Sequence, residues 1–220
     1  MHDLYAFLVG PLMWAVAIVF IGGLVWRFVA ITRLARKKDP YVMHYLKAKW
    51  TLRSWGAWLI PYYPRSMRMH PWVTFFGFLF HIGVILVPIF LLAHILMWEE
   101  GALGISLWTM PEWLADVLTV CVLAGCVFFA ARRMTVNEVK YVTDWTDFAL
   151  LVVIALPFLT GILAHYQIFN YKFMIIFHIL AGQAALVIVP FSRIGHMIYG
   201  PMVRAYLGSE FGGVRHTKDW

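Results

Sequence analysis

The sequence predicts an all-α membrane protein, a bundle of five transmembrane helices. Of the 220 residues, 62% are apolar and only 13% are charged, and the mean hydropathy is +0.76. A soluble domain is usually about 45–50% apolar and about 25% charged, which excludes disorder, a disulfide scaffold and an ordinary water-soluble enzyme. Five continuous apolar runs are each long enough to span the hydrocarbon core as a helix, which takes about 20 residues. They cover approximately 4–32, 72–98, 111–131, 146–166 and 172–199, within one membrane domain over residues 1–220.

The positions of the basic residues predict the orientation of these spans. The first run has no Lys or Arg before it and many after it, the reverse of a cleaved signal peptide, so we expect an uncleaved anchor. If the N-terminus lies outside, seventeen of the eighteen Lys and Arg residues fall on the inner side, and Lys172 is the exception. The positive-inside rule therefore predicts a cytoplasmic C-terminus.

The segment 41–63 between the first two spans mixes basic and aromatic residues, a composition that favours the membrane interface. We expect a helix lying on the cytoplasmic surface, or a docking face for a cytoplasmic partner, and no binding of nucleic acid. The residues concerned are Lys47, Lys49, Arg53, Trp50, Trp55, Trp58, Tyr62 and Tyr63.

Histidines inside the predicted spans are the candidate functional residues. Ionisable side chains in lipid are costly and usually functional, and imidazole is a common axial ligand of haem iron. The alternative for each is a packed, hydrogen-bonded interior histidine. Four lie within spans and a fifth lies near the end of the fourth span: His81, His94, His178, His196 and His165.

The spacing of these histidines predicts two stacked sites. His178 and His196 are 18 residues apart, which in a continuous helix is five turns, so they share one face and lie about 27 Å apart along the axis. The second span runs the opposite way. Pairing by depth joins His81 with His196 at the inner side, and His94 with His178 at the outer side. Two bis-histidine irons placed this way would carry electrons across the bilayer.

An ideal helix would not place His81 and His94 on the same face, which argues against His94 as the outer ligand. His81 and His94 are separated by 13 residues, which an ideal helix turns into about 220°, so they do not share a face. Pro88 lies between them, and a proline kink could re-aim His94. His165, near the outer end of the fourth span, is the alternative outer ligand.

Two motifs stand out around the histidines of the second and fifth spans. The fifth span ends in Pro190-Phe191-Ser192-Arg193-Ile194-Gly195-His196, and the second contains Phe80-His81-Ile82-Gly83. These motifs resemble those of the respiratory nitrate reductase gamma-subunit family of five-helix, dihaem cytochromes b. Within this family the chain looks most similar to the small cytochrome b subunits of transmembrane redox complexes of the Hmc, Tmc and Dsr types from sulfate-reducing bacteria. The family's second histidine in the second helix comes earlier than His94, so His165 stays open as the outer ligand.

The resemblance implies the cofactors and partners. It implies two non-covalent haem b groups (iron protoporphyrin IX) in the cell inner membrane, with the N-terminus periplasmic, and a place in a respiratory complex. The implied partners are a periplasmic multihaem cytochrome c, a cytoplasmic iron–sulfur subunit of the heterodisulfide-reductase type, and other integral membrane subunits. Arg193, one turn before His196, is the candidate partner of an inner haem propionate, or a snorkelling arginine.

Three functions therefore remain as hypotheses. The first is an electron-transfer subunit that carries no bond chemistry of its own. The second is a quinol-oxidising or quinone-reducing subunit that binds menaquinone. The third is a metal transporter lined by histidines, which zinc chemistry disfavours because zinc sites usually add Cys or carboxylate ligands. Gly83 and Gly182 lie close after His81 and His178, and they leave room for either a macrocycle or a neighbouring helix.

Overall fold

The structure is a computed structural model that describes residues 2–102 and 104–220. The described residues form helices and connecting turns, with no strand among them, as the sequence predicts. In chain order the elements are α1 His2–Phe7, η1 Leu8–Leu12, α2 Met13–Lys38, α3 Val42–Tyr45, α4 Ala48–Leu59, α5 Arg65–Met69, α6 Pro71–Phe90, α7 Leu92–Met97, η2 Trp98–Ala102, α8 Glu112–Thr135, α9 Asn137–Tyr141, α10 Trp145–His165, α11 Tyr171–Phe191, η3 Arg193–Gly195, α12 His196–Ser209 and η4 Glu210–Val214.

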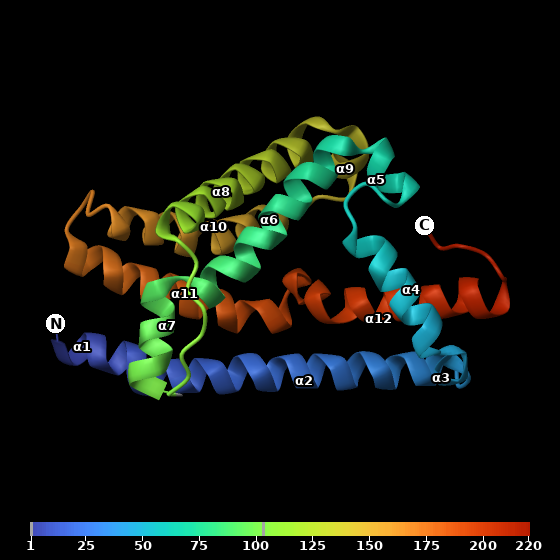
Figure 1. The fold of residues 1–220 in the computed structure, drawn as a ribbon, viewed down its shortest axis with the longest axis horizontal. Coiled ribbons are helices and arrows are strands. Elements are labelled where there is room, and N and C mark those ends of the chain that lie inside the picture. The colour runs from blue at the N-terminus through green and yellow to red at the C-terminus, as the bar shows by residue number, and fades with distance from the viewer. Residues whose placement is uncertain (1, 103) are drawn as a thin grey trace. The chain divides into compact units, whose positions relative to one another are not determined.

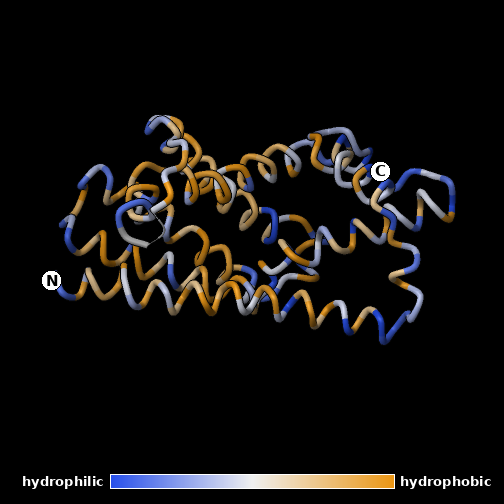
Figure 2. The backbone as a smooth tube through the Cα atoms, turned by 60° about the horizontal axis from the view of Figure 1, so that its bottom comes forward, coloured by the Kyte–Doolittle hydropathy of each residue, from blue (hydrophilic) through white to orange (hydrophobic). Residues whose placement is uncertain are grey.

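Within the described residues, five helical stretches are long and apolar enough to cross a membrane. No more than 33% of the most apolar part of any of them is buried within this chain, and Figure 2 shows the long helices coloured as hydrophobic over most of their length. Apolar surface that the chain itself does not bury needs lipid or other subunits around it. The chain therefore has the character of a multi-pass membrane protein. The five stretches are His2–Lys38, Pro71–Phe90, Glu112–Thr135, Trp145–His165 and Tyr171–Phe191.

The contacts divide the chain into two compact units. The first unit comprises Met1–Val16 and Phe75–Leu186, and the second comprises Ala17–Thr74 and Val187–Trp220. The helices α2, α6 and α11, labelled in Figure 1, each contribute residues to both units. The single membrane domain over 1–220 stays a prediction.

The core of the first unit lies where α6, α8 and α10 pack together. Val87 from α6, Leu118 and Val122 from α8, and Phe158 from α10 are all buried. Val122 is completely inaccessible. At the turn between α8 and α10, Arg133 forms an ion pair of 3.3 Å with the nearly inaccessible carboxylate of Asp147, which ties the ends of the two helices together.

Gly83 and Gly182 have different surroundings. A Cβ atom added at Gly83 would lie 2.5 Å from Cγ2 of Val122 and 2.9 Å from the carbonyl oxygen of Leu118, so this glycine permits the close approach of α6 to α8. No atom outside the backbone of its own helix lies within 4 Å of the corresponding position at Gly182. Helix packing therefore explains Gly83, but it does not explain Gly182.

A Gly83→Ala protein should be less stable by about 1–3 kcal/mol, because overpacking a tight contact forces the backbone apart. Thermal unfolding in detergent, followed by tryptophan fluorescence, measures this change. Gly22→Ala is the matched control, because no neighbouring element lies within 4 Å of a Cβ atom added there. It should leave the melting temperature unchanged or raise it, because alanine favours helix. Equal melting temperatures of the Gly83→Ala and wild-type proteins would contradict the interpretation of Gly83.

The second predicted span is shorter than expected, because the helix breaks at Leu91. We expected one run over 72–98, but α6 ends at Phe90 and Leu91 has an extended backbone (φ −68°, ψ 131°) before α7 begins. The last carbonyls of a helix have no hydrogen-bond donor within the helix. In α6, donors from outside the helix bond to two of these carbonyls. The amide of Met110 donates to the Phe90 carbonyl at 2.9 Å, and Nδ1 of His94 bonds the Pro88 carbonyl at 3.0 Å.

The fifth predicted span also breaks, so the expectation of one continuous helix from His178 to His196 is wrong. The helix α11 ends at Phe191, and Ser192 is extended (φ −116°, ψ −175°). The Ser192 hydroxyl accepts a hydrogen bond of 3.2 Å from the amide of Ile194 and so starts the short helix η3. His196 is the first residue of α12. The five-turn argument for a shared face therefore does not apply to these two histidines.

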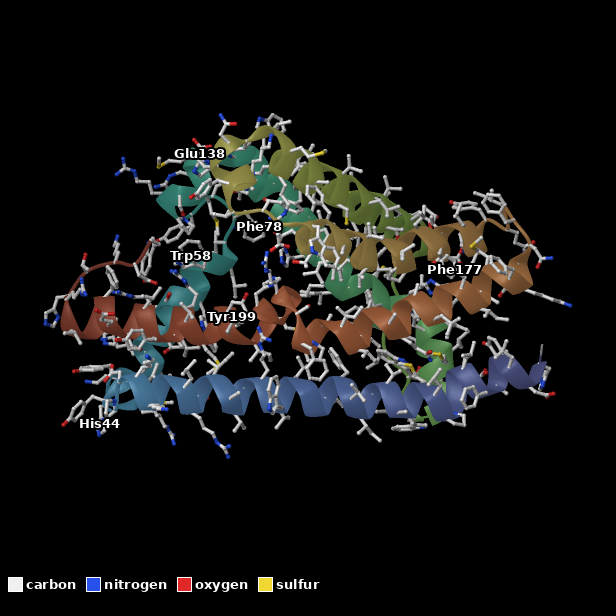
Figure 3. The ribbon with its side chains drawn as sticks, turned by 180° about the vertical axis from the view of Figure 1, so that it is seen from behind. His44, Trp58, Phe78, Glu138, Phe177 and Tyr199 are labelled. Atoms are coloured by element: carbon white, nitrogen blue, oxygen red, sulfur yellow. The ribbon has the colours of Figure 1, made fainter. Side chains whose placement is uncertain are left out.

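In the second unit, the segment 41–63 forms two helices, α3 and α4, and α4 packs against α12, as Figure 1 shows. Ser54 is fully buried in this contact, and its hydroxyl donates to the Asp219 carboxylate at 2.5 Å. The Arg204 guanidinium lies 4.1 Å from the centre of the Trp58 ring, which Figure 3 labels, and pairs with Asp219 at 3.2 Å. Burial lowers the pKa of Arg204 from its ordinary value, and the ion pair with Asp219 opposes this shift.

Candidate functional site

The imidazoles of His94 and His178 lie next to each other in the first unit. Their ring centres are 6.0 Å apart and their planes differ by only 5°. His94 comes from α7 and His178 from α11, so the break at Leu91 helps to place the two rings together. The structure therefore brings together two of the histidines that depth pairing had joined.

Each ring has one nitrogen fixed by a backbone carbonyl. Nδ1 of His94 lies 3.0 Å from the Pro88 carbonyl oxygen, and Nδ1 of His178 lies 2.9 Å from that of Pro157. A carbonyl oxygen only accepts hydrogen bonds, so Nδ1 carries the hydrogen in each ring. A neutral imidazole in this tautomer presents its lone pair at Nε2, which is the arrangement typical of metal-binding histidines.

The helix α10 forms the wall beside His178. A Cβ atom added at Gly161 would lie 3.0 Å from Cε1 of the His178 ring, so glycine at this position lets the ring approach α10 closely. One residue earlier, the Thr160 hydroxyl is within 3.3 Å of Nδ1 of His178 and donates to the Leu156 carbonyl at 2.6 Å. The sequence carries no local signal for these contacts, because they depend on how α10 packs against α11.

His94 and His178 are the residues that would hold a haem iron in this unit, each through Nε2. Their ring-centre separation of 6.0 Å leaves room for one metal ion between two imidazoles, since a metal–imidazole bond is about 2 Å long. Among the described residues, no three His, Cys, Asp or Glu side chains come together as a metal-binding group, but a haem iron needs only axial ligands from the protein.

The alternative outer ligand, His165, has a different environment. It is the exposed last residue of α10, and its ring packs edge-to-face against Tyr166 with centres 4.8 Å apart. In turn, the Tyr166 hydroxyl donates to the Asp116 carboxylate at 2.7 Å. The ring beside His178 is that of His94.

The two predicted inner ligands, His81 and His196, belong to different units. In the first unit, Nδ1 of His81 lies 2.7 Å from the Gly77 carbonyl oxygen. In the second unit, Nδ1 of His196 lies 3.2 Å from the Arg193 carbonyl oxygen. Both therefore present the same tautomer as His94 and His178. Their pairing stays a prediction, as does the contact of Arg193 with a propionate.

Arg27 makes contacts in the structure that the charge pattern of the sequence did not predict. Arg27 is one of the basic residues used to predict orientation, but its guanidinium donates to the Pro190 carbonyl at 3.3 Å and lies over the Tyr199 ring. A signal existed in the sequence, since Arg27 falls inside an apolar run, and arginine there is rare unless it has a function.

The fold defines a helical, multi-pass membrane protein in which two histidines of different helices lie side by side. A protein from Nitratidesulfovibrio vulgaris (strain Hildenborough), named only "Protein", is 37% identical over 216 residues, which cover 94% of this chain and 93% of that protein. This chain belongs to the same family as that protein. No family model matches the chain, and no solved structure matches it.

Proposed function

We propose that this chain is a haem b-containing membrane subunit of a respiratory redox complex, similar to the nitrate reductase gamma-subunit family, and that it transfers electrons across the membrane. The observation that carries the proposal is the adjacent, nearly parallel pair of imidazoles from His94 and His178, whose ring centres are 6.0 Å apart. In this proposal they hold the outer haem, and His81 and His196 hold the inner one. A haem b supplies one-electron chemistry at its iron.

The histidines act as ligands and fix the orientation of the sites. The carbonyls of Pro88 and Pro157 hold the rings of His94 and His178 in one tautomer, which raises the basicity of the opposite nitrogen. The lack of a side chain at Gly161 lets the His178 ring lie close against α10. The chain itself makes and breaks no covalent bond, so its contribution is to bind, orient and shield the redox groups.

The proposed orientation has the N-terminus in the periplasm and the C-terminus in the cytoplasm, with the spans in the inner membrane. One contact supports a common side for two of the basic segments. The helix α4, within 41–63, packs against α12, which follows the last span. Segments in direct contact outside the spans lie on the same side of the bilayer, and the positive-inside rule favours the cytoplasm for both.

We also propose that α4 lies at the membrane interface. The surface of α4 that packs on α12 contains hydroxyls, because Thr51 and Ser54 bond to groups of α12 and the C-terminal tail. The apolar residues Leu52 and Leu59, seven positions apart, are 63% and 74% exposed. Seven residues are about two helical turns, so these two share one face. Apolar side chains on the outward face favour lipid or a membrane subunit as the neighbour of α4.

The proposed partners follow from the two membrane sides. A periplasmic multihaem cytochrome c would exchange electrons with the outer haem, and a cytoplasmic iron–sulfur subunit would do so with the inner haem. Other integral membrane subunits would cover part of the exposed apolar surface. Examples of that surface are Ile18 and Val127, both 70% exposed.

A quinol-oxidising or quinone-reducing role is the second candidate, and one contact favours it. The carboxylate of Asp116 accepts the Tyr166 hydroxyl at 2.7 Å, beside His165 and in the same unit as the His94–His178 pair. Such a group is able to receive a proton from a quinol. Reduction of the haem b bands by a menaquinol analogue, measured on the purified chain alone, would favour this role.

The test of the proposed function is a pyridine haemochrome spectrum of the purified protein together with a protein assay. We expect the b-type spectrum and two haems for each chain. Folded protein purified from haem-supplied cells without a b-type signal would overturn the proposal. It would leave the metal-transporter hypothesis, which metal analysis of the same sample addresses.

A further inference from the structure

The break between α11 and η3 lies against one face of α2. Gly23 and Arg27 are one helical turn apart, so they share that face. A Cβ atom added at Gly23 would lie 2.7 Å from Cβ of the buried Pro190, so glycine at this position permits the contact. Beside it, the rings of Trp26 and Phe191 are 6.0 Å apart. The helix α2 therefore contacts the last two residues of α11.

Arg27 contacts both sides of the break. Its Nη1 donates to the Pro190 carbonyl at 3.3 Å, and this carbonyl belongs to the last turn of α11, where helical partners are missing and a cation is favoured. On the other side, a Cβ atom added at Gly195 would lie 3.3 Å from Nε of Arg27. The guanidinium thus lies against the end of α11 and against η3 at the same time.

The same guanidinium is close to the environment of His196. Its central carbon lies 5.8 Å from the centre of the Tyr199 ring, and that ring lies 6.5 Å from the imidazole of His196. Figure 3 labels Tyr199 on α12. The Tyr199 hydroxyl and Nδ1 of His196 both donate to the Arg193 carbonyl, at 3.4 and 3.2 Å. Guanidinium, phenol and imidazole therefore form one continuous set of contacts.

We propose that Arg27 is a positioning residue for His196. The position of His196, as the first residue of α12, is set by the break. Arg27 links the two sides of the break through its hydrogen bond to Pro190 and its cation–π contact with Tyr199. An arginine within an apolar span is costly, and this set of contacts gives it a reason. The inference rests on the proposed function, because it concerns His196 as a haem ligand.

The test uses the full-length chain in which His178→Ala has removed the outer site, so that the inner haem is observed alone. Adding Arg27→Met should speed the loss of this haem to excess apomyoglobin by about tenfold, the effect typical of changes around a metal ligand. It should also change the electron paramagnetic resonance g-values of the ferric haem. Arg27→Lys keeps the charge and should restore most of the wild-type behaviour.

Two controls separate positioning from general destabilisation. Arg33→Met removes the same charge from an exposed position of α2 and should change neither the haem-loss rate nor the g-values. In a His196→Ala background, which keeps the outer haem alone, Arg27→Met should also leave both unchanged. If Arg27→Met does not accumulate in membranes, Arg27→Gln takes its place with the same expectations.

The outcomes are distinct. Unchanged haem loss and unchanged g-values in both uncharged Arg27 variants would overturn this inference and leave the proposed function intact. Equal effects on the inner and outer haems would also overturn it, because they would indicate a general loss of stability. A wild-type protein without haem would overturn the proposed function and this inference with it.

Discussion

A His178→Ala protein should purify with one haem b for each chain in place of two. The physical reason is the geometry of the outer site, in which the imidazoles of His94 and His178 are 6.0 Å apart and nearly parallel. An iron that loses one of two axial imidazoles has no other protein ligand at that position, since alanine offers none. The haem-to-protein ratio from a pyridine haemochrome spectrum measures the change directly.

The matched variants make this result specific. His94→Ala should lose the same haem as His178→Ala, so the two single variants and the double variant should give the same spectrum. His165→Ala removes an exposed imidazole whose ring packs on Tyr166, and it should keep both haems. Loss of a haem in His165→Ala together with two haems in His94→Ala would instead make His165 the outer ligand.

The number and type of the long helices could be predicted from the sequence alone. A membrane span requires a long apolar run, and that property is local, so all five runs correspond to helices long and apolar enough to cross a bilayer. The ends of these helices could not be predicted equally well. The break at Leu91 depends on Met110 and His94, which bond to carbonyls of α6 from outside it. An apolar run gives no sign of such partners.

The candidate site shows the same limit. The histidines stand out by residue type, because ionisable side chains are rare within apolar runs. Their pairing depends on backbone geometry that an ideal helix does not describe. The angle of about 220° between His81 and His94 in an ideal helix argued against a pair of His94 with His178, yet the break at Leu91 separates α7 from α6 and removes that constraint. The break at Ser192 likewise removes the argument that placed His178 and His196 on one face.

The residues of α10 that lie beside His178 could not be predicted from the sequence for a further reason. Gly161 and Thr160 contact His178 from α10, and glycine and threonine are common in membrane helices for packing alone. Neither residue type indicates a ligand-binding site by itself. Their relevance appears only once α10 and α11 are placed side by side.

A His196→Ala protein should lose the inner haem and retain the outer one. His196 starts α12 with Nδ1 bonded to the Arg193 carbonyl at 3.2 Å. In the proposed function this ring binds the inner haem, and alanine offers no ligand in its place. The expected protein has one haem for each chain, as in His178→Ala, but with the spectrum and the potential of the other site. His81→Ala should give the same species as His196→Ala, because both residues are proposed to bind one iron.

The electron-transfer measurement adds the functional consequence of this change. In membranes that contain the complete complex, a periplasmic donor should still reduce the remaining haem of the His196→Ala protein, whereas transfer to the cytoplasmic iron–sulfur acceptor should fall to background. In the His178→Ala protein the block should lie earlier, before reduction of the inner haem by the periplasmic donor. Two haems in the His196→Ala protein, or different spectra for His81→Ala and His196→Ala, would refute the inner pair. The outer pair of His94 and His178 would then stand alone, and the chain would need an inner ligand from another residue or from a partner subunit.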